Sequence, residues 1–420
     1  MDKNVSEQTP KEPLLFLCHR IPFPPNKGDK IRSFNMLKKL SEKFDIHLGC
    51  FIDDPFDKQY AGKLNEYCQS VFTLNQSKIL SKINGLKSFV SGQPISLPYY
   101  FDSKMQQWVN RIVAHHDIKQ AFVYSSSMAQ YIENSASTPH HEMDRIIDFV
   151  DVDSDKWRQY AAKKSGIAKW VFNREYRLLA QYENLICDQF DRCIFVSPDE
   201  AKLFRDYQPE HNQRKVSGLL NGVDIDFFDP SVEFSKETLV PTIPFISFTG
   251  AMDYWANIDS VMWFVENVWP TIIKKKPQTI FCIVGGNPSA EVIALGKQQG
   301  IVVTGRVHDV RPFIANAKCV VAPIQIARGI QNKVLEAMSL NKNIVCTPMA
   351  MEGINAIPSG DIKITDGAQQ FAIECVDYLT TGDSNCKNRH WIIENFTWQQ
   401  TLAPLMQYFR VGANSENYRN

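Results

Sequence analysis

The segment 327–338, which reads ARGIQNKVLEAM, holds the residues of this chain with the clearest chemical potential. It follows the apolar run CVVAP (319–323) and is predicted to begin a helix, whose first N–H groups can bind an anion. Lys333 and Arg328 can neutralise a diphosphate there, and Glu336 can accept hydrogen bonds from a ribose diol. A purely solvated helix face is the alternative, which the neighbouring apolar residues disfavour. The predicted ligand groups are Arg328, Gly329, Ile330, Asn332, Lys333 and Glu336.

Two carboxylates, Asp151 and Asp153, follow a predicted strand (145–150). A DxD spacing binds a metal in some enzyme folds, and the run also begins like a calcium loop. The run is not a calcium-binding loop of the EF-hand type, because its sixth residue is Lys156 rather than Gly and its twelfth is Ala162 rather than Glu. The carboxylates could instead orient or deprotonate an acceptor hydroxyl. Helix capping by Asp153 or Ser154 is the alternative.

Three glycine turns follow predicted strands, at Gly28, Gly250 and Gly285, and Asn257 comes shortly after the second turn. Glycine lets the backbone approach a ligand closely, and the next helix presents free N–H groups. None of these turns fits the GxGxxG pattern with an acidic residue beyond it. A nicotinamide-dependent dehydrogenase is therefore disfavoured.

The segment 156–177 is basic and contains three large aromatic residues, Trp157, Trp170 and Phe172. Such a helix can lie on an anionic bilayer surface. A solvated face with buried tryptophans is the alternative, and the sequence leaves both open.

The elements that must position these residues alternate between short apolar strands and helical stretches, which predicts parallel sheets covered on both faces. The alternation stops near 225–243 and then begins again. We therefore predict an α/β protein with two doubly wound Rossmann-like domains, at 14–225 and 226–387, after a loose tail at 1–13. Ligands of such sheets bind beyond the carboxyl ends of the strands, so we expect the site in a cleft where the two domains face each other.

Composition excludes several classes of protein. The 420 residues include 46 Lys plus Arg and 46 Asp plus Glu, so no overall charge attracts nucleic acid. The ten cysteines form no CxxC pair and are expected to be reduced. No apolar run reaches the roughly 20 residues of a membrane span. We expect a cytoplasmic protein, with contact to the inner face of the cell membrane through 156–177 as the open alternative.

Several segments resemble the retaining family-four glycosyltransferases, which have the GT-B fold. They are LLNGVDIDFFDP, GRVHDVRPFIANAKCVVAP and RGIQNKVLEAM. In the N-terminal half, HRIPFPPNKGDKIRSF, HLGCFIDDP and DFVDVDSDKWRQYA resemble the sugar transferases of PEP-CTERM/exosortase exopolysaccharide systems. The segment ENFTWQQTLAPLMQYF is similar to the family's C-terminal helix, which implies that 388–420 crosses back to brace the first domain.

The resemblance assigns roles to individual residues. It implies that Glu336 binds the ribose and Lys333 the diphosphate, that Arg306 and Val307 lie near the base, and that Gly28 approaches the donor from the first domain. The chain also departs from the family. Arg328 replaces the first Glu of the family's motif, and the turn GAMDYWAN lacks the usual Arg and Lys pair, so Lys333 and Arg328 are the candidate replacements. Asp151 and Asp153 stand near the place of the family's histidine.

These observations predict a glycosyltransferase that moves a sugar from a nucleoside diphosphate sugar to a glycan or lipid-linked acceptor, without a cofactor or metal. Lys333, Asp151 and Asp153 are the candidate catalytic residues. A sugar-nucleotide epimerase of the same fold and a non-catalytic nucleotide-sugar-binding subunit are the rival hypotheses.

Overall fold

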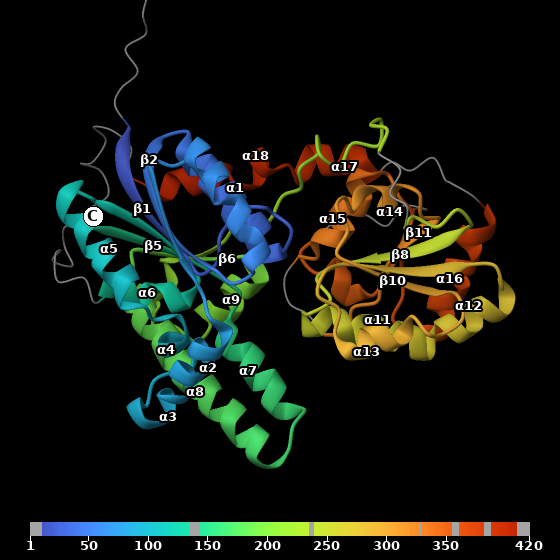
Figure 1. The fold of residues 1–420 in the computed structure, drawn as a ribbon, viewed down its shortest axis with the longest axis horizontal. Coiled ribbons are helices and arrows are strands. Elements are labelled where there is room, and N and C mark those ends of the chain that lie inside the picture. The colour runs from blue at the N-terminus through green and yellow to red at the C-terminus, as the bar shows by residue number, and fades with distance from the viewer. Residues whose placement is uncertain are drawn as a thin grey trace, which may run out of the picture. The chain divides into compact units, whose positions relative to one another are not determined.

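The computed structural model describes residues 11–133, 143–234, 239–326, 330–354, 361–381 and 388–409. They form two compact units (Figure 1). Unit 1 takes in the described parts of Met1–Leu219 and of Leu402–Asn420, and unit 2 is formed by Leu220–Thr401. Each unit is an α/β domain around one parallel sheet, as the sequence predicts.

The sheet of unit 1 has seven parallel strands in the order β3-β2-β1-β4-β5-β6-β7. The adjacent strands β2, β1, β4 and β5 end within two residues of one another, since Cys18 pairs with Cys50 and Tyr124, and Tyr124 pairs with Asp148. The loops that follow these strands therefore leave one edge of the sheet together. The strands are β1 (Glu12–Cys18), β2 (Phe44–Ile52), β3 (Ser70–Asn75), β4 (Gln120–Tyr124), β5 (Asp144–Val150), β6 (Arg192–Phe195) and β7 (Val216–Gly218).

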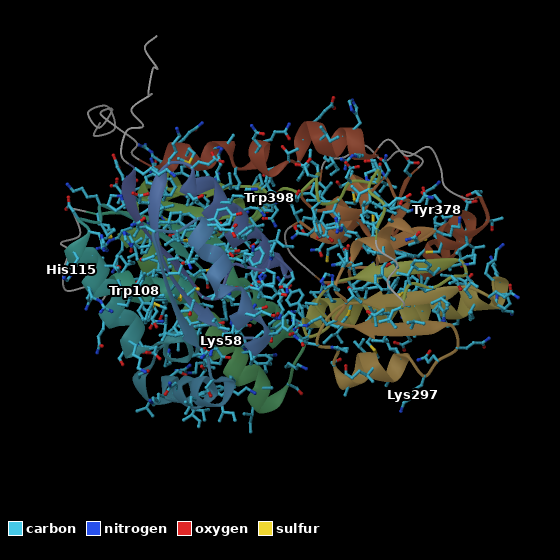
Figure 2. The ribbon with its side chains drawn as sticks, turned by 45° about the horizontal axis from the view of Figure 1, so that its top comes forward. Lys58, Trp108, His115, Lys297, Tyr378 and Trp398 are labelled. Atoms are coloured by element: carbon cyan, nitrogen blue, oxygen red, sulfur yellow. The ribbon has the colours of Figure 1, made fainter. Side chains whose placement is uncertain are left out.

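Helices cover both faces of this sheet (Figure 1). Trp108 of α5, labelled in Figure 2, stacks on Phe72 of β3 at 5.2 Å between ring centroids. A Cβ on Gly49 of β2 would lie 2.6 Å from the Trp108 ring, so this strand position must be glycine. The helices are α1 (Gly28–Ser41), η1 (Pro55–Glu66), α2 (Lys78–Leu86), α3 (Ser88–Ser91), α4 (Ser96–Tyr100), α5 (Ser103–His115), α6 (Ser126–Glu133), α7 (Asp153–Ala162), α8 (Gly166–Gln189), α9 (Pro198–Arg205) and α10 (Glu210–Gln213).

Unit 2 contains a six-stranded parallel sheet in the order β10-β9-β8-β11-β12-β13. Its strands are β8 (Phe245–Thr249), β9 (Ile280–Val284), β10 (Ile301–Gly305), β11 (Cys319–Ala322), β12 (Ile344–Cys346) and β13 (Ile362–Ile364). Its helices are α11 (Trp255–Asn267), α12 (Trp269–Lys275), α13 (Ala290–Leu295), α14 (Arg311–Ala315), α15 (Asn332–Ser339), η2 (Pro348–Met351), α16 (Ala368–Thr381), α17 (Asn388–Asn395) and α18 (Trp398–Thr401).

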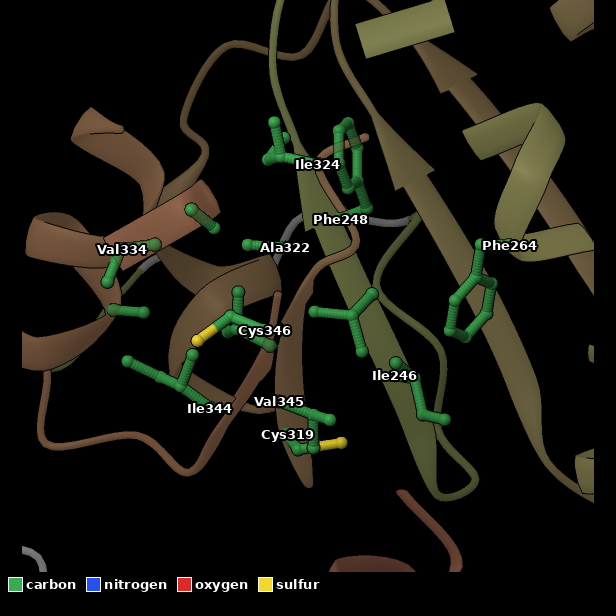
Figure 3. Packing of buried hydrophobic residues seen from close by; sticks show 14 of the residues in the cluster. Ile246, Phe248, Phe264, Cys319, Ala322, Ile324, Val334, Ile344, Val345 and Cys346 are labelled. Atoms are coloured by element: carbon green, nitrogen blue, oxygen red, sulfur yellow. The ribbon is translucent and has the colours of Figure 1, made fainter. Parts of the chain in front are cut away.

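Apolar strand residues of unit 2 pack against its helices (Figure 3). Phe248 of β8, Val334 of α15 and Ile344 of β12 are fully buried in this core. Because a strand covered on both faces is apolar at nearly every position, the continuous apolar runs of the sequence identify the inner strands β8, β9, β11 and β12. The start of α15 is thereby fixed beside the carboxyl ends of β8 and β11.

The segment ENFTWQQTLAPLMQYF (394–409), which resembles the family's C-terminal helix, is not one continuous helix. The structure breaks it into α17, α18 and the 3₁₀ helix η3 (Ala403–Tyr408). The break has a local cause, because Thr397 and Gln400 cap each other: the Gln400 N–H donates to Thr397 Oγ1 at 3.3 Å, and Thr397 N–H to Gln400 Oε1 at 3.1 Å. From Leu402 the chain belongs to unit 1, where Phe409 packs on Phe44 at 5.2 Å.

The segment before β8 is held by this same turn. The N–H of Val223 donates to Phe396 O at 2.8 Å. A Cβ on Gly222 would lie 2.6 Å from the backbone nitrogen of Trp398, which is labelled in Figure 2, so only glycine fits this crossing. None of the helices in the described ranges is both long enough and apolar enough to cross a bilayer.

Candidate functional site

The start of α15 brings Lys333 against Asn257, the third residue of α11. Lys333 Nζ lies 3.1 Å from Asn257 Oδ1 and 3.2 Å from Gln331 Oε1, and it stands 5.2 Å from the centre of the Phe248 ring. Asn257 Nδ2 donates to Ala251 O at 2.9 Å. Only 9% of the Lys333 surface is exposed. The structure therefore holds a buried cation beside the first N–H groups of a helix, where an anion binds most favourably.

Two of the predicted glycine turns meet at this place. A Cβ on Gly285 would lie 1.7 Å from Gly250 O, and a Cβ on Gly250 would lie 2.7 Å from Asn257 Nδ2. The N–H of Gly250 donates to Val284 O at 3.0 Å, and that of Gly285 to Gly305 O at 3.3 Å. The carboxyl ends of β8, β9 and β10 are therefore in direct contact. A side chain at Gly250 or Gly285 would force them apart.

Glu336 lies one helical turn beyond Lys333, and its side chain is partly exposed. Burial lowers the pKa of Lys333 to about 8, although the charge of Glu336 opposes this shift. Burial raises the pKa of Glu336 to about 7, and the charge of Lys333 opposes that shift. Both groups thus titrate near neutral pH in the free protein. An anionic ligand would stabilise the protonated form of Lys333.

The remaining predicted donor residues have different surroundings. Asn332 begins α15 and its Oδ1 accepts from Asn221 Nδ2 at 3.2 Å, whereas the Ile330 side chain belongs to the hydrophobic core. Arg306 is exposed, and its side chain lies 3.6 Å from where a Gly286 Cβ would be, so it belongs to the same group of turns. Val307 packs against a small core cluster. Arg328 and Gly329 lie outside the described residues.

In unit 1, Asp151 and Asp153 share one partner. Lys156 Nζ lies 2.7 Å from Asp151 Oδ2 and 3.1 Å from Asp153 Oδ1. The capping alternative is wrong, because α7 begins at Asp153 itself and its N-cap, Val152, makes no side-chain cap bond. A proton transfer to either carboxylate would have to loosen its contact with Lys156, and their catalytic role stays a prediction.

The turn before these carboxylates has an uncommon backbone. Val150 has φ 71°, a region that β-branched residues rarely adopt. The turn is held in place because the Val150 N–H donates to Asp148 Oδ1 and the Val196 N–H donates to Val150 O, at 2.8 and 2.6 Å. Asp148 in turn accepts from Arg32 Nε at 2.8 Å, with both side chains fully buried. Such strain persists only where the surroundings enforce it, and it clusters at functional sites.

A charged cluster lies at the carboxyl ends of β1 and β2, and the sequence alone does not predict it. Gly28 is the exposed first residue of α1, and the next residue, Asp29, lies 2.7 Å from Arg20 NH1. Arg20 Nε lies 3.1 Å from Asp53 Oδ2. Burial raises the pKa of Asp29, but the charges and hydrogen bonds of Arg20 and His19 together outweigh burial and leave that pKa below its usual range. Only the turn glycine marks this place in the sequence, because Arg20 and Asp53 lie in the loops after β1 and β2, whereas Asp29 lies in the first turn of α1.

Among the described residues, no three His, Cys, Asp or Glu side chains gather as a metal site.

The C-terminal unit of the chain is similar to a known protein family. Residues 243–381 match the model of the family described as Glycosyl transferases group 1. The chain is 21% identical over 371 residues to an uncharacterized 44.6 kDa protein in the cps region of Klebsiella pneumoniae, and the match covers 85% of this chain and 88% of that one.

Solved structures extend the similarity to both units. The sucrose-phosphate synthase of Thermosynechococcus elongatus superimposes with a TM-score of 0.67 at 13% identity, covering 94% of this chain and 98% of that one. HepE of Anabaena, in complex with UDP and glucose, gives a TM-score of 0.64 at 13% identity, with 94% and 98% covered. The structure of WaaG, a glycosyltransferase of lipopolysaccharide biosynthesis, gives 0.62 at 13% identity, with 94% and 99% covered. The chain thus has the GT-B fold of these glycosyltransferases.

Proposed function

Because residues 243–381 match the glycosyl transferases group 1 family and the chain has the GT-B fold, we propose that this protein is a retaining glycosyltransferase. It moves a sugar from a nucleoside diphosphate sugar to an acceptor hydroxyl during assembly of a cell-surface polysaccharide. The name of the Klebsiella relative, which refers to a cps region, supports the polysaccharide context. The resemblance of the N-terminal motifs to the PEP-CTERM/exosortase-associated sugar transferases supports that subgroup as part of the proposal.

One observation carries the donor side of the proposal: Lys333 is buried beside Asn257 at the start of α15. In the reaction, the bond between the anomeric carbon and the donor phosphate oxygen breaks, and its electron pair leaves on the diphosphate. The Lys333 ammonium and the N–H groups of α15 would stabilise that charge, without a metal. Glu336 would accept hydrogen bonds from the ribose, which fixes the nucleotide in the site.

The acceptor side of the proposal rests on Asp151 and Asp153. The acceptor oxygen bonds to the anomeric carbon, and its proton must pass to a base. One of these carboxylates would take that proton, with Lys156 holding both in position until the acceptor arrives. The acceptor is a glycan or a lipid-linked glycan.

HepE structures hold UDP and UDP-glucose, so uridine nucleotides are the first donors to test. The purified chain is screened by thermal shift against nucleoside diphosphates of different bases, because a bound ligand raises the melting temperature by mass action. The sugar donors of the preferred base are then incubated with lipid-linked glycan acceptors, and nucleotide release and the product's anomeric configuration are measured. We expect acceptor-dependent release with retention.

The rival hypotheses give different results in the same assay. An epimerase converts the nucleotide sugar when no acceptor is present. A non-catalytic subunit is stabilised by the nucleotide but releases no diphosphate with any acceptor. Inversion at the anomeric carbon would refute the retaining mechanism while leaving the transfer activity standing.

A further inference from the structure

Helices α2 and α3 and the first turns of α8 bear large apolar side chains that point to solvent. The α2–α8 patch is defined here as Ile79, Leu80, Ile83, Leu86, Phe89, Val90, Ile167 and Trp170. Val90 is 94% exposed, Ile167 83% and Ile79 73%. Single exposed apolar residues are ordinary on a protein surface, but a contiguous group marks an interaction site.

The members of the patch lie side by side. The Phe89 ring of α3 stacks with the Trp170 ring of α8 at 6.4 Å. Arg174 of α8 holds the two helices together, because its NH2 donates to Ser88 O at 2.5 Å and its guanidinium lies 4.7 Å from the Phe89 ring. Figure 1 shows α2 and α3 beside α8 at one end of unit 1.

The way α2 packs excludes a core role for these side chains. Its buried positions are small, since Ser81 is 6% exposed and a Cβ on the buried Gly85 would lie 3.0 Å from Ile95 Cγ2. Its large residues, Ile79, Leu80, Ile83 and Leu86, all face outward. An amphipathic helix of a globular domain buries its large apolar residues. This helix is oriented the opposite way.

Exposed lysines lie around the patch. Residues 67–101 contain Lys78, Lys82 and Lys87 but no Asp or Glu, and residues 159–173 contain Lys163, Lys164 and Lys169 but no Asp or Glu. The flanking cations Lys156, Arg158 and Arg174 are instead paired with acids. The side chains of Lys82, Lys87, Lys163, Lys164 and Lys169 are exposed. Because the whole chain has no net charge, this concentration of positive charge is local.

We propose that the α2–α8 patch binds the surface of an anionic lipid bilayer. Ile79, Val90 and Ile167 enter the interface between headgroups and acyl chains, and the surrounding lysines contact the lipid phosphates. The exposed Trp170 ring suits the same depth, where indole rings concentrate. A second copy of the chain fits less well, because two such patches would bring their lysines together. A nucleic acid offers no partner to the aliphatic side chains.

Vesicle flotation of the full chain tests this proposal. We expect binding to vesicles of phosphatidylcholine with phosphatidylglycerol to exceed binding to phosphatidylcholine alone by about tenfold or more, and to weaken at high salt. The double variant V90D/I167D should lose about tenfold or more of this binding, because it places two carboxylates at the interface. K82E/K169E should show a similar loss.

The matched control is Ile293→Asp, which puts one carboxylate on the 54% exposed Ile293 of α13 in unit 2. It should bind vesicles like the unaltered protein. Thermal melting checks the fold of each variant, which should be preserved because the altered side chains are exposed. Equal binding to both kinds of vesicle, or none, would overturn the proposal. So would a concentration-dependent dimer in light scattering that V90D/I167D abolishes, since the patch would then bind a second copy.

Discussion

Lys333 and Asn257 are 76 positions apart in the chain, yet Nζ of the first lies 3.1 Å from Oδ1 of the second. The contact ties the start of α15 to the start of α11, beside the glycine turns that end β8 and β9. Asn257 is itself oriented by its bond to Ala251 O. The ammonium group is therefore held in place before any ligand arrives, and such preorganisation makes electrostatic catalysis effective.

Replacing Lys333 with Met should sharply slow transfer without weakening the fold. Loss of one preorganised donor to a developing oxyanion costs about 10²–10³ in turnover. Keeping Lys333 charged in the folded protein at neutral pH costs about 3 kcal/mol, because burial lowers its pKa from 10.5 to about 8. The melting temperature of Lys333→Met should thus equal or exceed that of the unaltered protein.

The control for this variant is Lys297→Ala, at an exposed lysine of the same unit. Its turnover and melting temperature should stay unchanged. Near-normal transfer by Lys333→Met would remove Lys333 from the proposed mechanism. A large fall in its melting temperature would instead mean that the lysine is structural.

Affinity for UDP should fall above about pH 8. Lys333 has a lowered pKa, so it loses its proton, and with it the attraction for a diphosphate, as the pH rises through about 8. Beyond that point the affinity should fall by up to about tenfold per pH unit. Calorimetric titration with UDP at a series of pH values measures this fall in affinity. The Lys333→Met variant is the control, because any pH dependence that it retains belongs to UDP or to other groups. If its affinity changed with pH just as that of the unaltered protein does, Lys333 would not be the titrating group.

The neighbouring glycines 285 and 286 should differ sharply in their tolerance of alanine. At Gly285 the new Cβ would lie 1.7 Å from the carbonyl oxygen of Gly250, so two strand ends must move apart. At Gly286 the nearest atom is Arg306 Nε at 3.6 Å, an ordinary contact. We expect Gly285→Ala to lose more than about 3 kcal/mol and Gly286→Ala to stay within about 0.5 kcal/mol. Chemical unfolding measures both. Equal effects would mean that the two turns are not in contact.

Much of the fold could be predicted from the sequence, because strands covered on both faces appear as continuous apolar runs. None of β3, β7 and β13 has a continuous apolar run in the sequence, so they could not be predicted in this way, and all three lie at the edges of their sheets. β7 and β13 have only three residues each, and β3 is only half-buried along its length. Edge strands lack a second neighbour, so their apolar pattern is weak.

The candidate site shows the same limit. The helix start at α15 has a local sequence pattern, so Lys333 and Glu336 could be found in advance. Buried charge pairs have no local sequence pattern, since Arg32 and Asp148 are 116 positions apart. Only the fold brings such residues together, through the common edge at which parallel strands end.

Breaking the pair of Arg32 and Asp148 should destabilise unit 1. Both side chains are 0% exposed, and Arg32 also donates to Leu219 O at 2.7 Å. Asp148→Asn removes the negative charge and leaves the Arg32 cation buried, which costs about 3–5 kcal/mol. Chemical unfolding measures this loss, and because the chain has two units the fit must allow two transitions.

The exposed pair of Lys63 and Glu66 provides the control, since its side chains are 63% and 58% exposed at a separation of 3.3 Å. Water screens such a pair, so Glu66→Gln should change stability by less than about 0.5 kcal/mol. The double variant R32M/D148L removes both buried charges and should recover most of the stability that Asp148→Asn loses. If Asp148→Asn were as mild as Glu66→Gln, the Arg32 charge would have another counterpart, and the Val150 turn would not depend on this pair. If the double variant stayed as unstable as Asp148→Asn, the bonds of Arg32 to the Leu219 carbonyl would matter more than its charge.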